Sequence, residues 1–366
     1  MRIGMLAPLK RPLALTTTAS RPHLVYELIT RLQKRGHEII IFGTGDTNIP
    51  GVEVIPALPK SLVNLPPVEN PFYQHTAGIT KEILDAALNS NRVDVFHNHL
   101  YPEFLGLLLH KLTTKPILTT VHAQMTPELV AVLKLFPEAH LVSISKSHAR
   151  LGEGLKFDLV YNGIDIEAFR MIQNPTKDYL LFIGRMTGIK DESGNYIDPK
   201  GVLTAIEVAK RTDETLYISG NVEDRKFYDE KIKPELSDKI KFIGDVSAEQ
   251  PLDRETVVKL MQNAKAYLVP INWEEPFGLV MAEANACGTP VIAFRRGSVP
   301  ELIHDGVNGL IVDTVDQMVE AVKKVDMISR EACRKEVEQM FSLERMVDDY
   351  VRLYKGLIEL GIRNKE

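Results

Sequence analysis

The sequence predicts an α/β protein built from two Rossmann-like domains that face each other across a cleft. Strand-like apolar segments alternate with helix-like segments, and the alternation restarts after a polar, proline-bearing stretch at residues 171–178. This alternation is typical of parallel sheets covered by helices on both faces. We therefore expect a first domain at residues 1–170, a second at 177–345, and a last helix, 346–366, that packs back towards the first domain.

Apolar periodicity and the positions of glycine and proline predict the individual elements. Residues 23–36 are expected to form a helix because Leu24, Leu28 and Leu32 fall on one face. The other elements expected in the first domain are a helix at 102–112 and strands at 2–7, 37–43, 93–99, 116–122, 140–145 and 159–164. Those expected in the second are strands at 178–184, 215–220, 239–244, 265–270, 291–294 and 309–312 and helices at 201–212, 256–264 and 277–287.

The composition argues against several classes of protein. A net charge of -5 over 366 residues gives no overall basic field, so no nucleic-acid partner is expected. The two cysteines fit a reducing compartment, and no apolar run approaches the roughly 20 residues that a transmembrane helix needs. The first residues lead directly into a strand without the features of a signal peptide, so we expect a cytoplasmic protein. Neither half has Gly-x-Gly-x-x-Gly after its first strand or a P-loop, and no cofactor is expected.

The segment EEPFGLVMAEANACGTP, residues 274–290, carries the strongest functional signal. Glu275 precedes the predicted helix and Glu283 lies inside it. Between them, the N–H groups of Phe277, Gly278 and Leu279 carry the positive end of the helix dipole, and Gly278 lets a phosphate approach the backbone. This layout suits a sugar nucleotide, which has an anion in the middle and hydroxyl groups on either side. Alternatively, Glu275 complements the dipole and Glu283 faces solvent.

Other candidate residues lie at strand ends, where open α/β sheets bind their ligands. Arg185 follows a strand and Lys200 begins a helix, so the two could clamp a pyrophosphate without a metal, or could be ordinary surface cations. His122 ends a strand and could face a ligand or serve structure alone. His97 and His99 could ligate a metal, but no third ligand and no Asp-x-Asp pair is visible, so no metal is expected.

These motifs together resemble the retaining glycosyltransferases of family 4, which have the GT-B fold and a Glu-x7-Glu motif, here EPFGLVMAE at 275–283. The resemblance covers most of the chain and is closest at 177–313. The other matching segments are RGHEIIIFGTGDT (35–47), TTVHA (119–123), VYNGID (160–165), FIGRM (182–186), KG (200–201), FIGDV (242–246), GTPVIA (288–293), GSVPELI (297–303) and DGVNGLIVD (305–313).

The resemblance implies roles for individual residues. Arg185 and Lys200 would hold the diphosphate of the donor, Glu283 the ribose hydroxyls and Glu275 the hydroxyls of the transferred sugar. His122 would lie beside the donor sugar. The remaining donor-binding residues would be Phe277, Gly278 and Leu279 through their N–H groups, Gly244 and Val246 next to the base, Asn162, and Thr17.

The sequence departs from the family in two places. The loop after the first strand usually contains Gly-Gly, whereas residues 9–23 contain three threonines, Thr17 among them, and no glycine. Threonine hydroxyls could replace the missing N–H contacts. Arg185 and the Lys-Gly pair usually lie only a few residues apart, but here residues 186–199 intervene, and the stretch 190–195 within them is expected to form a mobile acidic loop. Lys190 in this insert competes for the phosphate role, although only Lys200 is followed by glycine and a helix.

The resemblance therefore implies a retaining, metal-independent transferase. It would move a hexose from a nucleoside-diphosphate sugar, with uridine favoured over guanosine, to the hydroxyl of an unidentified acceptor. The alternatives are a GT-B sugar-nucleotide epimerase or hydrolase, which forms no new glycosidic bond, and a nucleotide-sugar-binding protein that has lost transfer.

Overall fold

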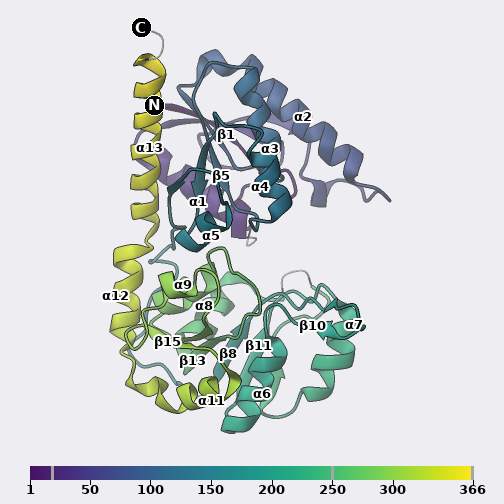
Figure 1. The fold of residues 1–366 in the computed structure, drawn as a ribbon, viewed down its shortest axis with the longest axis vertical. Helices are drawn as coiled ribbons and strands as arrows, with labels where there is room; N and C mark the ends of the chain where they lie inside the picture. The colour runs from purple at the N-terminus through teal and green to yellow at the C-terminus, as the bar shows by residue number, and fades with distance from the viewer. Residues whose placement is uncertain (18–19, 249–250, 364–366) are drawn as a thin grey trace. The chain divides into compact units, whose positions relative to one another are not determined.

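The chain forms two α/β units, each built on its own parallel sheet (Figure 1). The computed structural model describes residues 1–17, 20–248 and 251–363. We call Met1–Gly163 with Leu343–Glu366 the first domain, and Ile164–Ser342 the second domain. The segment 171–178 belongs to the second domain, where the N–H of Lys177 donates to the Asn263 carbonyl at 2.9 Å.

The first domain contains a seven-stranded sheet in the order β3-β2-β1-β4-β5-β6-β7, and every neighbouring pair is parallel. The chain order reverses between β1 and β4, which makes this point the topological switch of the sheet. The strands are β1 (Arg2–Leu6), β2 (Glu38–Thr44), β3 (Glu53–Leu58), β4 (Val95–Asn98), β5 (Ile117–Val121), β6 (His140–Ser143) and β7 (Phe157–Leu159).

Helices cover both faces of this sheet because both sets of alternating side chains are apolar. Ile39 and Ile41 of β2 pack in a cluster with helices α1 (Ser20–Lys34) and α13 (Leu343–Arg363). Ile40 and Phe42 point the other way, into a cluster with α2 (Phe72–Leu88). The last helix therefore completes the core of the first domain (Figure 1). The remaining helices of this domain are α3 (Glu103–Gly106), α4 (Pro127–Leu133) and α5 (Lys146–Leu151).

The second domain contains a six-stranded parallel sheet in the order β12-β11-β8-β13-β14-β15, with its switch point between β8 and β13. Its strands are β8 (Leu180–Ile183), β11 (Leu216–Ser219), β12 (Ile240–Phe242), β13 (Ala266–Val269), β14 (Val291–Phe294) and β15 (Gly309–Val312). Its helices are α6 (Val202–Thr212), α7 (Arg225–Phe227), α8 (Arg254–Asn263), α9 (Leu279–Ala286), α10 (Val299–Leu302), α11 (Val315–Lys324) and α12 (Arg330–Met340).

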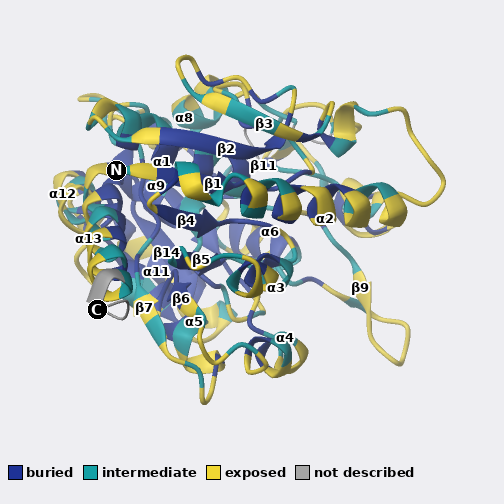
Figure 2. Cartoon of the chain, turned by 90° about the horizontal axis from the view of Figure 1, so that it is seen from above, coloured by how far each residue is buried: buried dark blue, intermediate teal, exposed yellow. Residues whose placement is uncertain are grey.

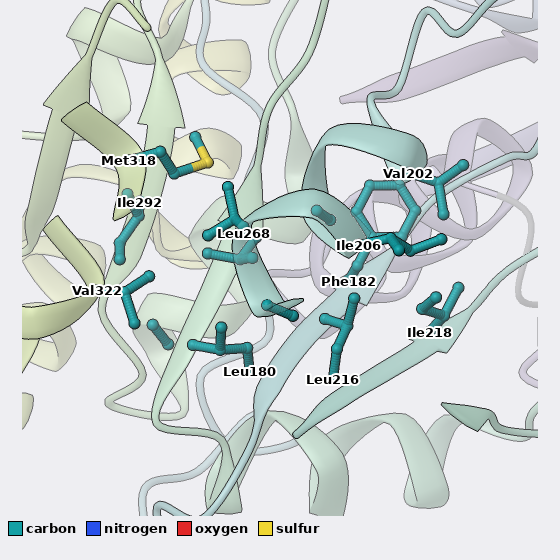
Figure 3. Packing of buried hydrophobic residues seen from close by; sticks show 14 of the residues in the cluster. Leu180, Phe182, Val202, Ile206, Leu216, Ile218, Leu268, Ile292, Met318 and Val322 are labelled. Atoms are coloured by element: carbon teal, nitrogen blue, oxygen red, sulfur yellow. The ribbon is translucent and has the colours of Figure 1, made fainter. Parts of the chain in front are cut away.

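One face of this second sheet packs on α6 and α11. Figure 3 shows Phe182 and Ile218 beside Val202 and Ile206 of α6, and Met318 of α11 near Ile292. All of these side chains are buried in a single apolar cluster. Helices α9 and α12 contact each other, and α9 also contacts β13 and β14. Helix packing therefore fixes the strand ends at which ligands of such sheets bind.

The predicted α/β class and the parallel sheets are confirmed, but several elements differ from the sequence predictions. The prediction of a strand at 159–164 is wrong, because β7 ends at Leu159 and the chain then leaves the sheet. The helix expected at 102–112 is split into α3 and a 3-10 turn, Leu107–Lys111. The sequence analysis missed strand β3 and helices α2, α4, α5, α7, α10, α11 and α12.

The insert at 186–199 contains a β-hairpin that the sequence did not predict, and the acidic stretch 191–195 forms its turn. Strand β9 (Ile189–Lys190) pairs antiparallel with β10 (Tyr196–Ile197), and Figure 2 shows the hairpin as largely exposed. The Asp191 carboxylate accepts hydrogen bonds from the N–H groups of Ser193 and Asn195, both at 2.9 Å, which closes the turn. Gly194 has a φ of 81° in this turn.

No helix within residues 1–17, 20–248 and 251–363 has the length and apolar character needed to cross a membrane.

Candidate functional site

The first candidate site lies at the switch point of the second sheet, where the segments after β8 and β13 meet. Gly201, just before α6, has a φ of 82°, and a Cβ there would collide with the carbonyl oxygen of Pro270 at the end of β13. Only glycine fits both the left-handed backbone and this close contact. The Lys-Gly pair thus holds the segment after β8 against the segment after β13, and Lys200 precedes the contact directly.

The backbone around Lys200 is fixed from both sides. The buried carboxylate of Asp198 accepts hydrogen bonds from the N–H groups of Gly201 and Leu203, each at 2.8 Å, and so starts α6. Burial raises the pKa of Asp198, although these N–H groups favour its charged form. Asn272 donates its backbone N–H to the Pro199 carbonyl at 2.8 Å and its side-chain amide to the Asp198 carbonyl at 3.0 Å. The sequence analysis missed both Asp198 and Asn272.

Lys200 and Glu275 form a close ion pair. The Lys200 Nζ lies 2.7 Å from Glu275 Oε2, and only 21% and 14% of the two side chains is exposed. Trp273 donates its indole N–H to the same carboxylate oxygen at 3.0 Å, and the Lys200 Nζ lies 4.4 Å from the centre of its ring. A cation, a carboxylate and an aromatic ring thus converge here. Trp273, the chain's only tryptophan, was missed, although its place two residues before Glu275 was a signal.

Helix α9 begins at Leu279, directly after Gly278 with its φ of 81°, and not at Phe277 as the sequence predicted. The carbonyl of Phe277 accepts the Ser298 hydroxyl at 2.7 Å, and the carbonyl of Glu275 accepts the Ser298 N–H at 3.0 Å. These bonds fix the chain before the helix, and the N–H groups at its first turn carry the positive end of the dipole.

The two carboxylates of the Glu-x7-Glu motif lie near the same buried phenol. Tyr267 of β13 donates its hydroxyl to the Ile183 carbonyl at 2.7 Å, at the end of β8. Burial raises the pKa of Tyr267, and the negative charges of Glu283 and Glu275 raise it further. Both carboxylates therefore lie close to the switch point, and Glu283 is half-buried.

Arg185 follows β8, as predicted, but its side chain points to another group. It is 57% exposed and lies 3.4 Å from Glu223 Oε1, while Thr187 donates its hydroxyl to the other oxygen of Glu223 at 2.6 Å. An exposed pair of this kind contributes little free energy, so a phosphate could displace it. The structure brings Lys200 and Glu275 together but leaves Arg185 paired elsewhere.

The segment expected to border the base lies after β12. Gly244 has a φ of 106°, and a Cβ there would collide with the carbonyl oxygen of Pro251. Val246 is half-buried and packs against the apolar cluster of the second domain. The Asp245 carboxylate accepts the N–H of Ser247 at 2.8 Å. Gly244 is thus needed for a close backbone contact, and Val246 belongs to the edge of the core.

Three predicted residues lie in the first domain. Thr17 is buried and donates its hydroxyl to the Pro12 carbonyl at 2.8 Å, so this hydroxyl shapes its own loop. The neighbouring Thr18 and Ala19 lie outside the described residues. Asn162 is buried, and its side-chain oxygen has no hydrogen-bond partner in the described part of the chain.

His122, the third of these residues, follows β5 and is held by Glu103. The buried Glu103 carboxylate accepts the N–H groups of His122 and Ala123, at 3.1 and 2.9 Å, and pairs with Arg21 at 2.8 Å. The His122 Nε2 lies 2.9 Å from Nδ1 of His99. Burial lowers the pKa of His122, and the charge of Arg21 lowers it further, so the ring is neutral at pH 7.

His97 and His99, considered above as metal ligands, instead form hydrogen bonds with each other and with Tyr354 and Thr120. Within residues 1–17, 20–248 and 251–363, no group of three or more His, Cys, Asp or Glu side chains is arranged to hold a metal ion.

Comparisons with known proteins agree with this architecture. The family described as Glycosyltransferase Family 4 matches residues 23–168, and the family described as Glycosyl transferases group 1 matches residues 166–340. A D-inositol 3-phosphate glycosyltransferase of Mycobacterium marinum is 25% identical over 369 residues, covering 88% of this chain and 77% of that protein.

Two solved structures share the fold. The sucrose-phosphate synthase of Thermosynechococcus elongatus has a TM-score of 0.75 at 18% sequence identity. The match covers 98% of this chain and 99% of the chain of the synthase. An Anabaena protein in complex with UDP-glucose has a TM-score of 0.69 at 15% sequence identity. The match covers 97% of this chain and 100% of the Anabaena chain. The two family matches adjoin and cover nearly all of both domains. The chain therefore belongs to glycosyltransferase family 4 and is a glycosyltransferase with the GT-B fold.

Proposed function

We propose that this glycosyltransferase moves a hexose from a nucleoside-diphosphate sugar to an acceptor hydroxyl, with retention of the anomeric configuration and without a metal. The observation that carries this proposal is the convergence of Lys200, Glu275 and Trp273 at the switch point of the second sheet. One ligand with a diphosphate and sugar hydroxyls has partners for each of these groups. The UDP-glucose bound to the Anabaena structure of the same fold supports a uridine nucleotide as the first candidate donor. A guanosine nucleotide is our second candidate.

In the resting site Lys200 and Glu275 neutralise each other, and each has a natural partner in the donor. The diphosphate takes the Lys200 ammonium, while the sugar hydroxyls donate to the released carboxylate of Glu275. Glu283, in the first turns of α9, binds the ribose hydroxyls. Because Asp198 and Asn272 hold the backbone at Lys200, the ammonium is positioned before the ligand arrives.

The chemical step breaks the bond between the anomeric carbon and the diphosphate oxygen, which keeps the electron pair. Lys200, Arg185 and the N-terminus of α9 stabilise the negative charge that develops on the diphosphate. The acceptor oxygen bonds to the anomeric carbon from the same face, and its proton passes to the departing diphosphate. The products are a glycoside and a nucleoside diphosphate.

The remaining predicted residues have supporting roles in this proposal. His122 forms a hydrogen bond with the transferred sugar, and the segment of Gly244 and Val246 borders the base. Phe277, Gly278 and Leu279 present backbone N–H groups, and Asn162 and Thr17 contribute to donor binding. The acceptor is a hydroxyl compound whose identity the donor site does not determine.

Thermal unfolding in EDTA with a panel of nucleotide sugars tests donor binding. We expect a UDP-hexose to raise Tm most, a GDP-hexose to follow, and the free sugars to have no effect. If no nucleotide sugar stabilises the wild-type protein, the proposal is wrong. Stabilisation without turnover on any acceptor indicates a binding protein, and release of free sugar or an epimer indicates a hydrolase or an epimerase.

A further inference from the structure

A chain of hydrogen bonds connects His122 to helix α13 inside the first domain. Nε2 of His122 lies 2.9 Å from Nδ1 of His99, and Nε2 of His99 lies 3.1 Å from Nδ1 of His97. Nδ1 of His97 also lies 2.6 Å from the hydroxyl of Tyr354. On the other side of its ring, Nε2 of His97 lies 2.8 Å from the Thr120 hydroxyl, which lies 3.0 Å from the hydroxyl of Tyr350.

All three imidazoles are neutral at pH 7. Burial lowers the pKa of His97 well below its usual value, and its neighbours His99 and His122 lower it further. Burial and the charge of Arg21 lower the pKa of His99 to about 3. The pKa of His122 is lowered by burial, Arg21, His99 and His148. Each ring therefore carries one proton, on either Nδ1 or Nε2.

Only two arrangements of these ring protons satisfy every contact between the imidazoles. If Nδ1 of His97 accepts, then Nε2 of His99 must donate to it, Nδ1 of His99 must accept, and Nε2 of His122 must donate. If Nδ1 of His97 donates, every role is reversed, and His122 carries its proton on Nδ1. Any mixed arrangement would place two protons or two lone pairs against each other. The tautomer of His97 therefore sets the tautomer of His122.

The hydroxyl of Tyr354 distinguishes the two arrangements. If Nδ1 of His97 accepts, Tyr354 donates to it, while Nε2 of His97 donates to Thr120 and Thr120 donates to Tyr350. The hydroxyl proton of Tyr350 then has no acceptor within this chain of hydrogen bonds. If Nδ1 of His97 donates, Tyr350 donates to Thr120 and Thr120 donates to Nε2 of His97. The hydroxyl proton without an acceptor in the chain of hydrogen bonds is then that of Tyr354. Of the two hydroxyls that contact His97, that of Tyr354 lies closer, at 2.6 Å against 2.8 Å for Thr120. Because O–H donors form shorter hydrogen bonds than N–H donors, we assign Tyr354 as the hydroxyl that donates and Thr120 as the one that accepts.

We propose that Tyr354 is a positioning residue that fixes the tautomer of His122 through His97 and His99. Its phenol donates to Nδ1 of His97, and the relay leaves the His122 proton on Nε2, facing His99. With its proton on Nε2, the neutral ring of His122 presents Nδ1 as an acceptor. Helix α13 thus sets the hydrogen-bonding character of a residue at the end of β5.

The consequence for catalysis rests on the function proposed above. A sugar hydroxyl bound at Nδ1 of His122 must donate its proton there. If the tautomer is reversed, the hydroxyl has to accept instead and turn away from its other partners. Losing one neutral hydrogen bond in this way lowers kcat/KM by about two- to tenfold.

The test compares two tyrosines of the same helix. Tyr354 and Tyr350 are both fully buried, and their rings stack with centroids 6.2 Å apart. The full-length protein is labelled with 15N-histidine, and long-range 1H–15N correlation spectra identify which nitrogen of His122 is protonated. The signals of His122 are assigned from their loss in His122→Asn. The spectra of wild type, Tyr354→Phe and Tyr350→Phe are then compared at pH 7.

In wild type we expect the proton of His122 on Nε2. Tyr354→Phe removes the hydroxyl that donates to His97. It also removes the only hydroxyl proton that lacks an acceptor in the reversed arrangement, so the ring proton of His122 should move to Nδ1. Tyr350→Phe leaves the Tyr354 hydroxyl in place as the donor to Nδ1 of His97, so the tautomer should remain as in wild type. A wild-type proton on Nδ1, an unchanged tautomer in Tyr354→Phe, or an equal change in both variants would overturn the proposal.

Two features keep this test independent of folding defects and of the proposed function. If Tyr354→Phe does not fold, the wild-type spectrum and Tyr350→Phe still decide the tautomer. The spectra require no substrate, so an absence of transfer in wild type would contradict the proposed function and leave the relay intact. With an active enzyme, Tyr354→Phe should show the two- to tenfold loss of kcat/KM.

Discussion

Replacing Lys200 by alanine is expected to lower kcat/KM for sugar transfer at least about tenfold. The Lys200 Nζ is only 2.7 Å from Glu275, and 21% of its side chain is exposed, so water screens its charge less than that of a surface lysine. A hydrogen bond to a charged group contributes about 1.5–3 kcal/mol, which corresponds to roughly a tenfold to hundredfold change in rate. Initial rates at varied donor concentration measure the effect.

Lys190 provides a matched control, because each lysine lies over an aromatic ring. The Lys200 Nζ is 4.4 Å from the Trp273 ring centre, and the Lys190 Nζ is 4.7 Å from that of Tyr196. Lys190 is exposed on the hairpin, so Lys190→Ala should lower kcat/KM less than about threefold. Lys200→Met, which keeps the alkyl chain, should behave like Lys200→Ala. If Lys190→Ala is the more damaging change, the assignment of the phosphate contact is wrong.

Further predictions concern the carboxylates, the metal, the hairpin and the effect of pH. Glu283→Ala should weaken binding of the free nucleoside diphosphate about ten- to a hundredfold, whereas Glu275→Ala should mainly impair the intact sugar donor; equal losses of diphosphate affinity in calorimetry would contradict these roles. Turnover should persist in EDTA, and activity that disappears and returns with Mn²⁺ would refute metal independence. Deleting residues 187–197 should raise the KM of the acceptor while donor affinity, measured by calorimetry, is kept; a parallel loss of donor affinity would place the hairpin at the donor. The pKa of His99 is about 3 in the folded protein and about 6.5 in the unfolded chain, so below pH 6.5 the unfolded chain binds a proton on this ring more readily than the folded protein does. The contribution of the neutral ring to stability is therefore complete only above pH 6.5. Lowering the pH from 7 to 5 should therefore reduce the free energy of unfolding by about 2 kcal/mol through His99 alone. Urea unfolding curves that do not change over this range would argue against this prediction.

Local signals were sufficient to predict the helix that contains Glu283, although it begins at Leu279 and not at Phe277. Gly278 and Gly288 both have positive φ angles, and α9 lies between them at Leu279–Ala286. Each boundary depends on the backbone freedom of one glycine, which the sequence displays directly. The start of α6 after Lys200 was predictable for the same reason.

Elements that depend on distant contacts were missed or misplaced. Strand β3 contains Pro56, which argues against a strand, but β3 lies at the sheet edge, where a missing N–H is tolerated. The strand expected at 159–164 ends at Leu159, which pairs with the last residue of β6, and the N–H of Gly163 donates to Met346 Sδ at 3.1 Å. A Cβ on Gly163 would also lie 2.6 Å from the Leu343 backbone. This contact with α13 has no local signal.

The partners within the site also could not be read from the sequence. Lys200 and Glu275 meet only because β8 and β13 are neighbours in the sheet, although they are far apart in the chain. The chain of His122, His99 and His97 likewise joins the ends of β4 and β5 to α13. Residue types indicated which side chains were chemically suitable, and strand order determined which of them meet.

The most direct test of the central claim is the anomeric configuration of the product. The wild-type enzyme is incubated in EDTA with the best-bound α-linked nucleotide sugar and a panel of hydroxyl acceptors that includes inositol phosphates, and the product is examined by proton NMR. We predict a new glycosidic bond with the α configuration and one nucleoside diphosphate released per bond. A β-linked product, or release of the diphosphate with only free or epimerised sugar, would contradict retaining transfer.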